Sequence, residues 1–334
     1  MQGKTHLLVI GSGSVGRRHS RNFAKLGCAI SCVDPREDRR AELASEVSVV
    51  ATFPSIESAL RARRYDAAVV SSPPHVHVPQ TFECLNAGLP VLLEKPICAN
   101  VADAASLHEM QSRAAVPVLL GYTWRWWPPL HYVRELLAQR VIGTLRHVRF
   151  VMSAHLADWH PWERYQDFFM ARRELGGGAL LDESHWTDLA CWLFGLPDTV
   201  CARVEKISNL DIDADDNVDM LLTYRDGPRV YLHLDLYGRP HEKTITFVGD
   251  EGTIRWSADP NRVQVGRGAS DFEETRSFAC ERNDMFVAVA EEFLQVVAGG
   301  RPSCTLTDGM NVMRIVEAAR ASGGRTVNLA ESAR

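Results

Sequence analysis

Three side chains able to move a proton follow a run of glycines near the middle of the chain. The glycines at 176–178 let the backbone approach a neighbour closely. Asp182, His185 and Asp188 then recur at intervals of three, which places them on one side of a helix. A histidine between two carboxylates is a candidate acid or base, because its ordinary pKa of about 6.5 suits proton transfer at neutral pH. The alternative is a helix start in which Asp182 lies near the cap and the histidine is satisfied structurally.

A glycine loop near the N-terminus predicts a nucleotide site. The apolar run 5–10 predicts a buried strand, the loop follows at once, and a helical pattern comes next. Gly11 permits the tight turn, Gly13 lets a pyrophosphate touch the backbone, and Gly16 lets helix and strand pack closely. A glycine turn without a ligand is the alternative. The predicted cradle reads Gly11-Ser12-Gly13-Ser14-Val15-Gly16, with Ser14 and Val15 at the helix start.

Asp34 ends the second predicted strand, 29–33, where an acidic residue meets the adenosine ribose. Its carboxylate accepts hydrogen bonds from the ribose hydroxyls and repels a 2′-phosphate, so NAD is favoured as the cofactor. Arg36 lies two residues on and would weaken that preference, which keeps NADP as the alternative.

Strands alternating with helices continue beyond Asp34 and predict a parallel sheet covered on both faces, with the ligand at the carboxyl ends of its strands. Two of those ends carry unusual chemistry. Pro73 and His77 belong to a stiff loop expected to lie along the cofactor, and Glu94-Lys95-Pro96 puts an ammonium where the nicotinamide should lie. For Lys95 the alternative is an ordinary loop. The predicted elements are strands 47–50, 66–71, 89–93 and 116–120 and helices 55–64, 78–87 and 101–115.

Length and composition describe an ordinary globular protein. The 334 residues exceed what one core usually holds, so we expect two domains, 1–122 for the dinucleotide and 123–334 for substrate and oligomerisation. With 37 Lys plus Arg against 42 Asp plus Glu, nothing favours nucleic acid or an anionic membrane as a partner. The eight cysteines show no zinc spacing and are expected to be reduced core residues, and no metal is expected. Without a signal pattern or a span of roughly 20 apolar residues, a cytoplasmic location is the expectation.

The second half predicts a mostly antiparallel sheet, because short turns separate its strands. Its broad outer face is an expected oligomer surface. One continuous helix is expected over 180–194, and helices over 284–297 and 308–321. Residues 211–216 resemble the opening of a calcium loop but lack its glycine and its final glutamate, so we predict a solvated hairpin loop. The predicted strands are 145–152, 199–206, 217–224, 229–237, 243–249, 252–256 and 262–266.

An aromatic segment, defined here as residues 155–165, precedes Phe168, Phe169 and the glycines. Aromatic faces stack on the C–H faces of a sugar ring while histidine and aspartate bind hydroxyls, so the segment is a candidate substrate wall. Trp159, His160 and Tyr165 are its candidate substrate contacts. The alternative, considered equally good, is an aromatic packing loop between domains.

Taken in order, these motifs resemble the Gfo/Idh/MocA oxidoreductase family over nearly the whole chain. The resemblance rests on the glycine loop with His19, on Pro73 with His77, on Glu94-Lys95-Pro96, and on the triple glycine with Asp182 and His185. The segment Gly121-Tyr122-Thr123-Trp124-Arg125-Trp126 is similar to the family's Gly-Phe-x-x-Arg-Phe stretch, which joins two domains. The family implies an N-terminal Rossmann domain, a C-terminal α/β domain with an open, largely antiparallel sheet, and hydride exchange between NAD or NADP and a sugar, inositol or sugar derivative.

The resemblance also implies residue roles. Lys95, Asp182 and His185 match the family's usual catalytic set, Arg125 joins the expected substrate contacts, and the bond before Pro96 is expected to be cis. The family usually separates the aspartate and histidine by four residues, whereas here they are three apart. This Ser-His variant is similar to members of modified-sugar or surface-polysaccharide pathways, which often carry an Asp-Trp-His-Pro segment like that at 158–161.

The chemistry expected is loss of a hydride and a proton from a carbinol. His185 would take the proton, Lys95 would stabilise the developing alkoxide, and Asp182 would position His185 or bind a second hydroxyl. Two alternatives use the same fold: redox-assisted elimination or glycoside cleavage, in which NAD is reduced only transiently, and a non-catalytic dinucleotide-binding regulator. A homodimer or homotetramer through the second sheet is expected.

Overall fold

The computed structural model describes residues 4–159, 163–269 and 271–329, and the chain forms two compact units. Unit 1 comprises Met1–Thr123 and Arg282–Met310, and unit 2 comprises Trp124–Glu281 and Asn311–Arg334. A single division after residue 122 leaves out the return of Arg282–Met310 to unit 1. That return is explained by packing, because the Phe293 ring meets the Phe23 ring edge-on with centroids 6.0 Å apart. None of the described helices combines the length and the apolar character needed to cross a bilayer.

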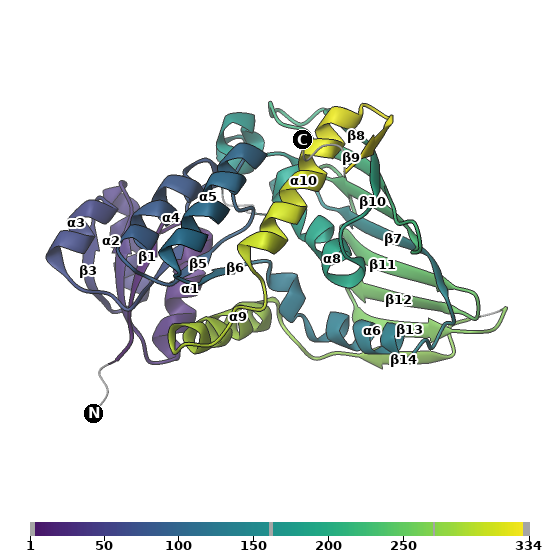
Figure 1. Cartoon of the computed structure of the whole chain (residues 1–334), viewed down its shortest axis with the longest axis horizontal. Coiled ribbons are helices and arrows are strands. Elements are labelled where there is room, and N and C mark those ends of the chain that lie inside the picture. Colours follow the sequence, from purple (N-terminus) through teal and green to yellow (C-terminus); the bar gives the residue numbers. More distant parts are fainter. Residues whose placement is uncertain (1–3, 160–162, 270, 330–334) are drawn as a thin grey trace. The chain divides into compact units, whose positions relative to one another are not determined.

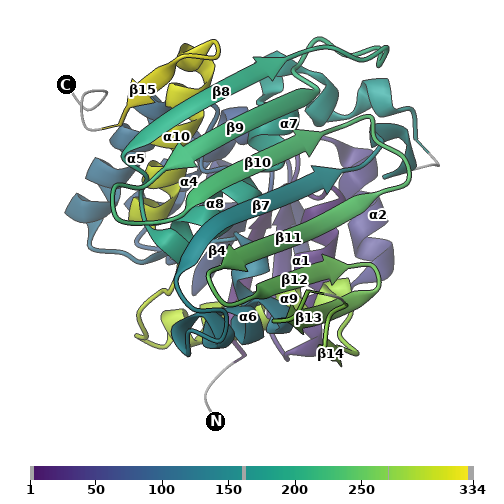
Figure 2. The ribbon, with the colours of Figure 1, turned by 90° about the vertical axis from the view of Figure 1, so that its right-hand side faces the viewer.

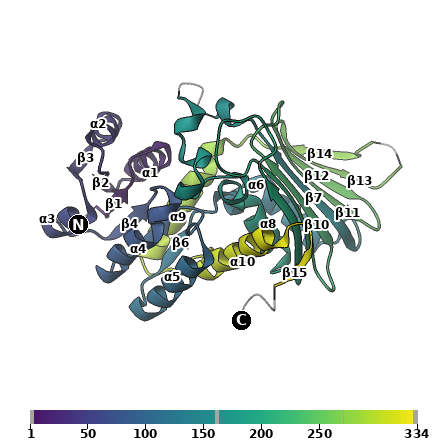
Figure 3. The same cartoon turned by 90° about the horizontal axis from the view of Figure 1, so that it is seen from above.

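Unit 1 is built on a six-stranded parallel sheet in the order β3-β2-β1-β4-β5-β6. Its central strand reads His-Leu-Leu-Val-Ile, and the last four of these residues are buried, as expected of a strand covered on both faces. Helices α1, α2 and α9 lie on one face and α3, α4 and α5 on the other (Figure 3). The strands are β1 (His6–Ile10), β2 (Ala29–Val33), β3 (Val49–Phe53), β4 (Ala67–Val70), β5 (Val91–Leu93) and β6 (Val118–Leu120). The helices are α1 (Ser14–Lys25), α2 (Glu37–Glu46), α3 (Ile56–Ala62), α4 (His77–Asn86), α5 (Val101–Ala114) and α9 (Arg282–Val297).

Unit 2 is built on a nine-stranded sheet, which faces the reader in Figure 2. Its order is β14-β13-β12-β11-β7-β10-β9-β8-β15, and every neighbouring pair is antiparallel except β7 with β10, which are parallel. The strands are β7 (Leu145–Ser153), β8 (Thr199–Glu205), β9 (Asn217–Thr223), β10 (Arg229–Asp235), β11 (Glu242–Gly249), β12 (Thr253–Ala258), β13 (Asn261–Gly266), β14 (Glu274–Ser277) and β15 (Thr326–Asn328).

Helices cover only one face of this sheet among the described residues of unit 2 (Figures 1 and 3). Helices α7 (Ala179–Asp182) and α8 (Ser184–Phe194) pack on β10, and α6 (Pro128–Ala138) packs on β12 and β13. Helix α10 (Leu306–Ser322) begins in unit 1 and ends in unit 2. Helix α6 and the short strands β14 and β15 are not among the elements expected from the sequence. For α6 the signal was present, since prolines occupy its first two positions and Leu130, Val133 and Leu136 form a buried stripe.

The uncovered face of the nine-stranded sheet carries a polar network. On β10, residues 230, 232 and 234 are buried, so Tyr231 and His233 lie on the opposite face. The imidazole of His233 lies between two carboxylates, with Nδ1 2.8 Å from Asp219 Oδ1 and Nε2 3.1 Å from Asp235 Oδ2. Tyr231 donates its hydroxyl hydrogen to the same oxygen of Asp219. The hydrogen bond to Asp235, opposed by partial burial and supported by Asp219, raises the pKa of His233 to about 9.

This network predicts a loss of stability at alkaline pH. Because the pKa of His233 is higher in the folded chain than its ordinary value of about 6.5, the stabilisation is complete below about pH 6.5 and is lost as pH rises through about 9. We expect the free energy of unfolding of the native chain to fall over that range by about 1 to 2 kcal/mol more than that of His233→Gln, after allowance for solvent screening. Urea unfolding at several pH values measures this, and parallel curves for the two proteins would contradict it.

Candidate active site

The glycine loop of unit 1 is fixed by close backbone contacts. Gly11 has φ +90° and its N–H donates to Val33 O at 2.8 Å. A Cβ at Gly11 would lie 2.7 Å from Ser72 N, and one at Gly16 would lie 1.9 Å from Gly11 O. Both positions therefore exclude larger residues, which agrees with the roles that the sequence predicts for them.

The start of α1 fits an anionic ligand. Gly13 is its N-cap, no side chain caps the free N–H groups there, and the first turn contains no acidic residue. A Cβ at Gly13 would meet no atom within 4 Å, so this glycine is not required by the packing of the chain itself. Uncapped N–H groups and the positive end of the helix dipole suit a pyrophosphate. Ser14 and Val15 supply the first two of these N–H groups.

Asp34 fastens the glycine loop. Its carboxylate is 4% exposed and accepts hydrogen bonds from Ser12 N at 2.8 Å and from Arg36 N at 2.9 Å. Each oxygen keeps a further lone pair with which a ribose hydroxyl can be bound. The guanidinium of Arg36 is paired with Asp38, which offsets the charge that a 2′-phosphate would need.

Glu94 ties α1 to the loop that carries the candidate lysine. Its buried carboxylate lies 2.7 Å from Nε2 of His19, a fully buried residue of α1, and accepts from Lys95 N at 3.3 Å. Gly121 is packed against it, since a Cβ there would lie 3.0 Å from the carboxylate. The Lys95–Pro96 peptide is cis, as the family resemblance implies. Glu94 belongs to the motif expected at the cofactor, and its hydrogen bonds hold the lysine loop.

His77 holds the same loop from the other side. Its ring is fully buried, with Nδ1 2.8 Å from Pro96 O and Nε2 2.7 Å from Ser72 O. Burial lowers the pKa of this imidazole, and the two carbonyls that face its nitrogens oppose that shift. His77 therefore joins the loop at Pro73 to the loop at Lys95. Within that frame the side chain of Lys95 is half-buried, between the buried residues Glu94 and Pro96.

In unit 2, the glycines before α7 approach the protein itself. A Cβ at Gly177 would lie 2.4 Å from Phe169 O, and one at Gly178, where φ is +108°, would lie 2.5 Å from an oxygen of Asp215. The helix that follows is not continuous over 180–194 as expected. It breaks at Glu183, whose carboxylate is buried and accepts from the indole N–H of Trp186 at 2.9 Å.

Asp188 is committed to a buried ion pair. Arg125 donates two hydrogen bonds to it, from Nε to Oδ2 at 2.8 Å and from Nη2 to Oδ1 at 2.7 Å. Both side chains are almost fully buried. Asp188, one of the two carboxylates expected to flank His185, therefore has both of its oxygens hydrogen-bonded to Arg125. Through this pair Arg125, which the family resemblance places among the expected substrate contacts, fastens the segment η2 (Thr123–Trp126) to α8.

His185 differs from its neighbours in exposure. It is half-buried, whereas Asp182 is 5% exposed and Ser184 is fully buried. Behind it, the fully buried ring of Trp186 packs 5.9 Å from Trp124, measured between ring centroids. Helix α8 therefore has a rigid apolar backing, and His185 is the titratable side chain of this turn with solvent access.

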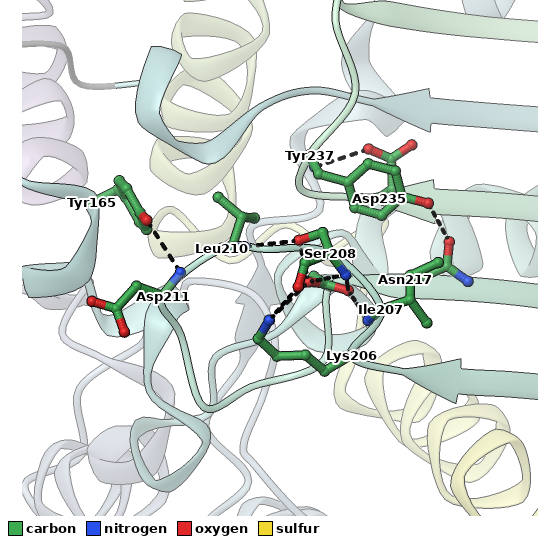
Figure 4. Close-up of polar contacts among 10 residues, drawn as sticks. Tyr165, Lys206, Ile207, Ser208, Leu210, Asp211, Asn217, Asp235 and Tyr237 are labelled. Carbon is green, nitrogen blue, oxygen red and sulfur yellow. Dashed lines mark hydrogen bonds and ion pairs between the residues drawn. The ribbon is translucent and has the colours of Figure 1, made fainter.

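The aromatic segment is only partly described. His160 lies outside the described residues, and Trp159 follows the short helix η3 (Leu156–Asp158) with a half-buried side chain. The Tyr165 hydroxyl accepts a hydrogen bond from Asp211 N at 3.1 Å (Figure 4). Asp158 pairs with Arg239, whose two nitrogens lie 2.7 and 2.6 Å from its oxygens, and this pairing lowers the pKa of Asp158 to about 2. These contacts favour a packing role for Tyr165 and leave Trp159 as the candidate sugar platform.

No group of three or more His, Cys, Asp or Glu side chains within the described ranges is arranged to hold a metal ion.

Comparisons with known proteins cover both units. The model of the oxidoreductase family with an NAD-binding Rossmann fold matches residues 5–122, and that of the GFO/IDH/MocA C-terminal domain matches 130–255. The rhizopine catabolism protein MocA of Rhizobium meliloti is 26% identical over 97% of this chain and 96% of its own length. An uncharacterized oxidoreductase of Synechocystis is 28% identical, but the match spans only 64% of this chain and 57% of that protein.

Solved structures share the fold over the whole chain. Levoglucosan dehydrogenase, solved with NADH and levoglucosan, has a TM-score of 0.86 at 17% identity and covers 98% of this chain and 100% of its own. The WlbA dehydrogenase of Bordetella pertussis, solved with NADH and UDP-GlcNAcA, has a TM-score of 0.80 at 20% identity. The match covers 98% of this chain and 99% of that chain.

Two glycine variants separate packing from cofactor binding. Gly13→Ala should keep the stability of the chain, because its methyl group meets no protein atom, but should weaken NADH binding about tenfold or more by standing between backbone and pyrophosphate. Gly16→Ala should lower the melting temperature as well. Circular dichroism and a fluorescence titration measure both effects. Native NADH affinity in Gly13→Ala would mean that this loop is not the cradle.

The Arg125–Asp188 ion pair should contribute far more to the free energy of unfolding than an exposed ion pair of the same geometry. Arg125→Leu leaves a buried charge on Asp188 and should cost about 3 to 5 kcal/mol of unfolding free energy. Arg146→Leu removes an exposed bidentate partner of Asp250 and should cost less than about 1 kcal/mol. Urea unfolding compares them, and equal costs would show that the buried pair does not anchor α8.

Proposed function

Because the chain belongs to the Gfo/Idh/MocA family of NAD-binding oxidoreductases, we propose that it is a dehydrogenase acting on a hydroxyl-bearing carbon of a sugar, inositol or sugar derivative, with nucleotide sugars included. One observation carries the proposal. Each unit presents a half-buried side chain suited to proton chemistry, Lys95 or His185, within a frame of buried neighbours. The sugar-type substrate is supported by the names of relatives, such as the D-apiose dehydrogenase of Paraburkholderia graminis, 23% identical over 96% of this chain.

In the proposed mechanism, NAD, when bound, supplies the hydride-transfer chemistry at its nicotinamide ring. The N–H groups at the start of α1 bind its pyrophosphate, and Asp34 binds its ribose. His185 takes the proton of the substrate hydroxyl. Lys95 donates a hydrogen bond to the same oxygen and stabilises the negative charge that develops on it. Asp182 orients His185 or binds a second hydroxyl, and Trp159 stacks on the sugar ring.

Three of the earlier residue assignments change in this proposal. Arg125 positions α8 through Asp188 and does not bind substrate. Glu94 and His77, expected among the cofactor contacts, are proposed here to position Lys95. We also propose a cytoplasmic protein that forms a homodimer or homotetramer through the uncovered face of the nine-stranded sheet, for which sedimentation velocity is the test.

A panel of free sugars, inositols and nucleotide sugars tests the reaction class. A dehydrogenase accumulates one NADH for each product molecule formed. Product without net NADH would instead identify transient oxidation within an elimination or glycoside cleavage. Binding of NADH with no turnover across the panel would favour a non-catalytic regulator.

Variants of the two proton-active residues test the mechanism. His185→Ala and Lys95→Met should each lower kcat on the active substrate by roughly 10²- to 10⁴-fold, because a positioned acid or base contributes that much. NADH affinity should be unchanged in His185→Ala. His147→Ala is the matched control, since His147 is exposed on β7 and should keep native turnover. Full turnover by His185→Ala would show that another group moves the proton.

A further inference from the structure

The loop at 211–216, here called the acidic loop, is not the solvated hairpin that its sequence suggests. Asp211 and Asp213 are exposed, but Asp215 is 9% exposed and Asp216 is fully buried. Burying a carboxylate is costly unless donors surround it, so the partners of these two residues show what the loop does. Asp216 fixes the loop itself: Ile207 N donates to it at 2.8 Å, and Ser208 and Lys206 also contact it.

Asp215 accepts hydrogen bonds at the start of α7. Its Oδ2 accepts from Leu180 N at 2.8 Å and its backbone carbonyl accepts from Ala179 N, also at 2.8 Å. These N–H groups open α7, whose own N-cap, Gly178, has no side chain to accept them. Asp215 thus supplies from a distant part of the sequence the cap that Gly178 lacks.

Gly178 and Asp215 depend on each other. A Cβ at Gly178 would lie 2.5 Å from Oδ1 of Asp215, so the third glycine makes room for this carboxylate. Burial raises the pKa of Asp215, while the Leu180 N–H and the charges of Arg320 and Arg173 favour its ionised form. Gly178 is therefore explained by a protein carboxylate at a helix start, and Gly177 by the nearby carbonyl of Phe169.

Two further contacts join the acidic loop to the segment that leads into the glycines. Asp213 Oδ1 accepts from Arg173 N at 2.7 Å, and Asp213 N donates to Ala171 O at 3.2 Å. Asp211 N donates to the Tyr165 hydroxyl (Figure 4). The acidic loop thus makes hydrogen bonds with five residues of the stretch from Tyr165 to Leu180, which leads into α7.

We infer that Asp215 is a positioning residue for His185: it fixes the start of α7, and α7 leads through the turn at Glu183 into α8, which carries the histidine. This inference rests on the proposed function. The loss of Asp215 should leave the cofactor side, in unit 1, untouched. It should act on the rate of the chemical step, because a misplaced acid/base group weakens the transition state without weakening substrate binding to the same degree.

The test compares Asp215→Ala, Asp215→Asn and Asp211→Ala. Asp215→Ala should lower kcat roughly 10- to 100-fold with a smaller change in KM and native NADH affinity. Asp215→Asn keeps an acceptor for Leu180 N and should recover most of kcat. Asp211→Ala alters an exposed side chain while its backbone N–H still reaches Tyr165, so it should behave as native.

Hydrogen exchange of the substrate-free protein separates this inference from the proposed function. Amides of residues 179–186 should exchange faster in Asp215→Ala and at the native rate in Asp215→Asn. Native exchange and native kcat in Asp215→Ala would overturn the inference. So would an Asp215→Asn as impaired as Asp215→Ala, because the hydrogen bond would then not be what matters. If no sugar-type substrate is turned over by the native chain, the proposed function fails, while the exchange data still decide whether Asp215 holds α7.

Discussion

The cost of burying an ionised carboxylate shapes both halves of this molecule. A carboxylate removed from water without partners costs several kcal/mol, so each buried one must collect donors. Asp34 collects backbone N–H groups of the glycine loop and its surroundings, and Glu94 collects a histidine and the N–H of Lys95. Asp188 accepts hydrogen bonds from a guanidinium, and Asp215 accepts one from a backbone N–H at the start of α7. In each case the donor belongs to a segment that carries or adjoins a candidate functional residue.

The hydrogen bonds that satisfy these carboxylates fix the loops. They explain why the candidate proton-active groups differ in exposure from the residues beside them. Lys95 and His185 are half-buried, and the residues beside them in the chain are buried. Side chains whose backbone is held by buried hydrogen bonds lose little further conformational freedom when they act. The two units achieve this independently, unit 1 through Glu94 and His77 and unit 2 through Asp188 and Asp215.

Local patterns in the sequence were sufficient for the features that depend on local physics. The glycine loop follows from steric needs within a few residues, and the parallel sheet covered on both faces follows from the alternation of strands and helices. Contacts between distant residues were not predictable from one sequence. The periodicity of Asp182, His185 and Asp188 predicted one continuous helix. No local pattern shows that Arg125 binds Asp188 or that the helix is interrupted at Glu183. The acidic loop looked solvated for the same reason, since the partners of Asp215 lie some 35 residues earlier in the chain.

The most direct measurement follows the hydrogen that leaves the substrate. A substrate found active in the panel is deuterated at its carbinol carbon, and a single turnover with NAD is analysed by mass spectrometry. Direct hydride transfer predicts that the deuterium is recovered in the reduced cofactor and that the turnover is slowed by the label. Deuterium that returns to the product, or that is lost to water while the cofactor stays oxidised, would contradict a dehydrogenase built on Lys95 and His185.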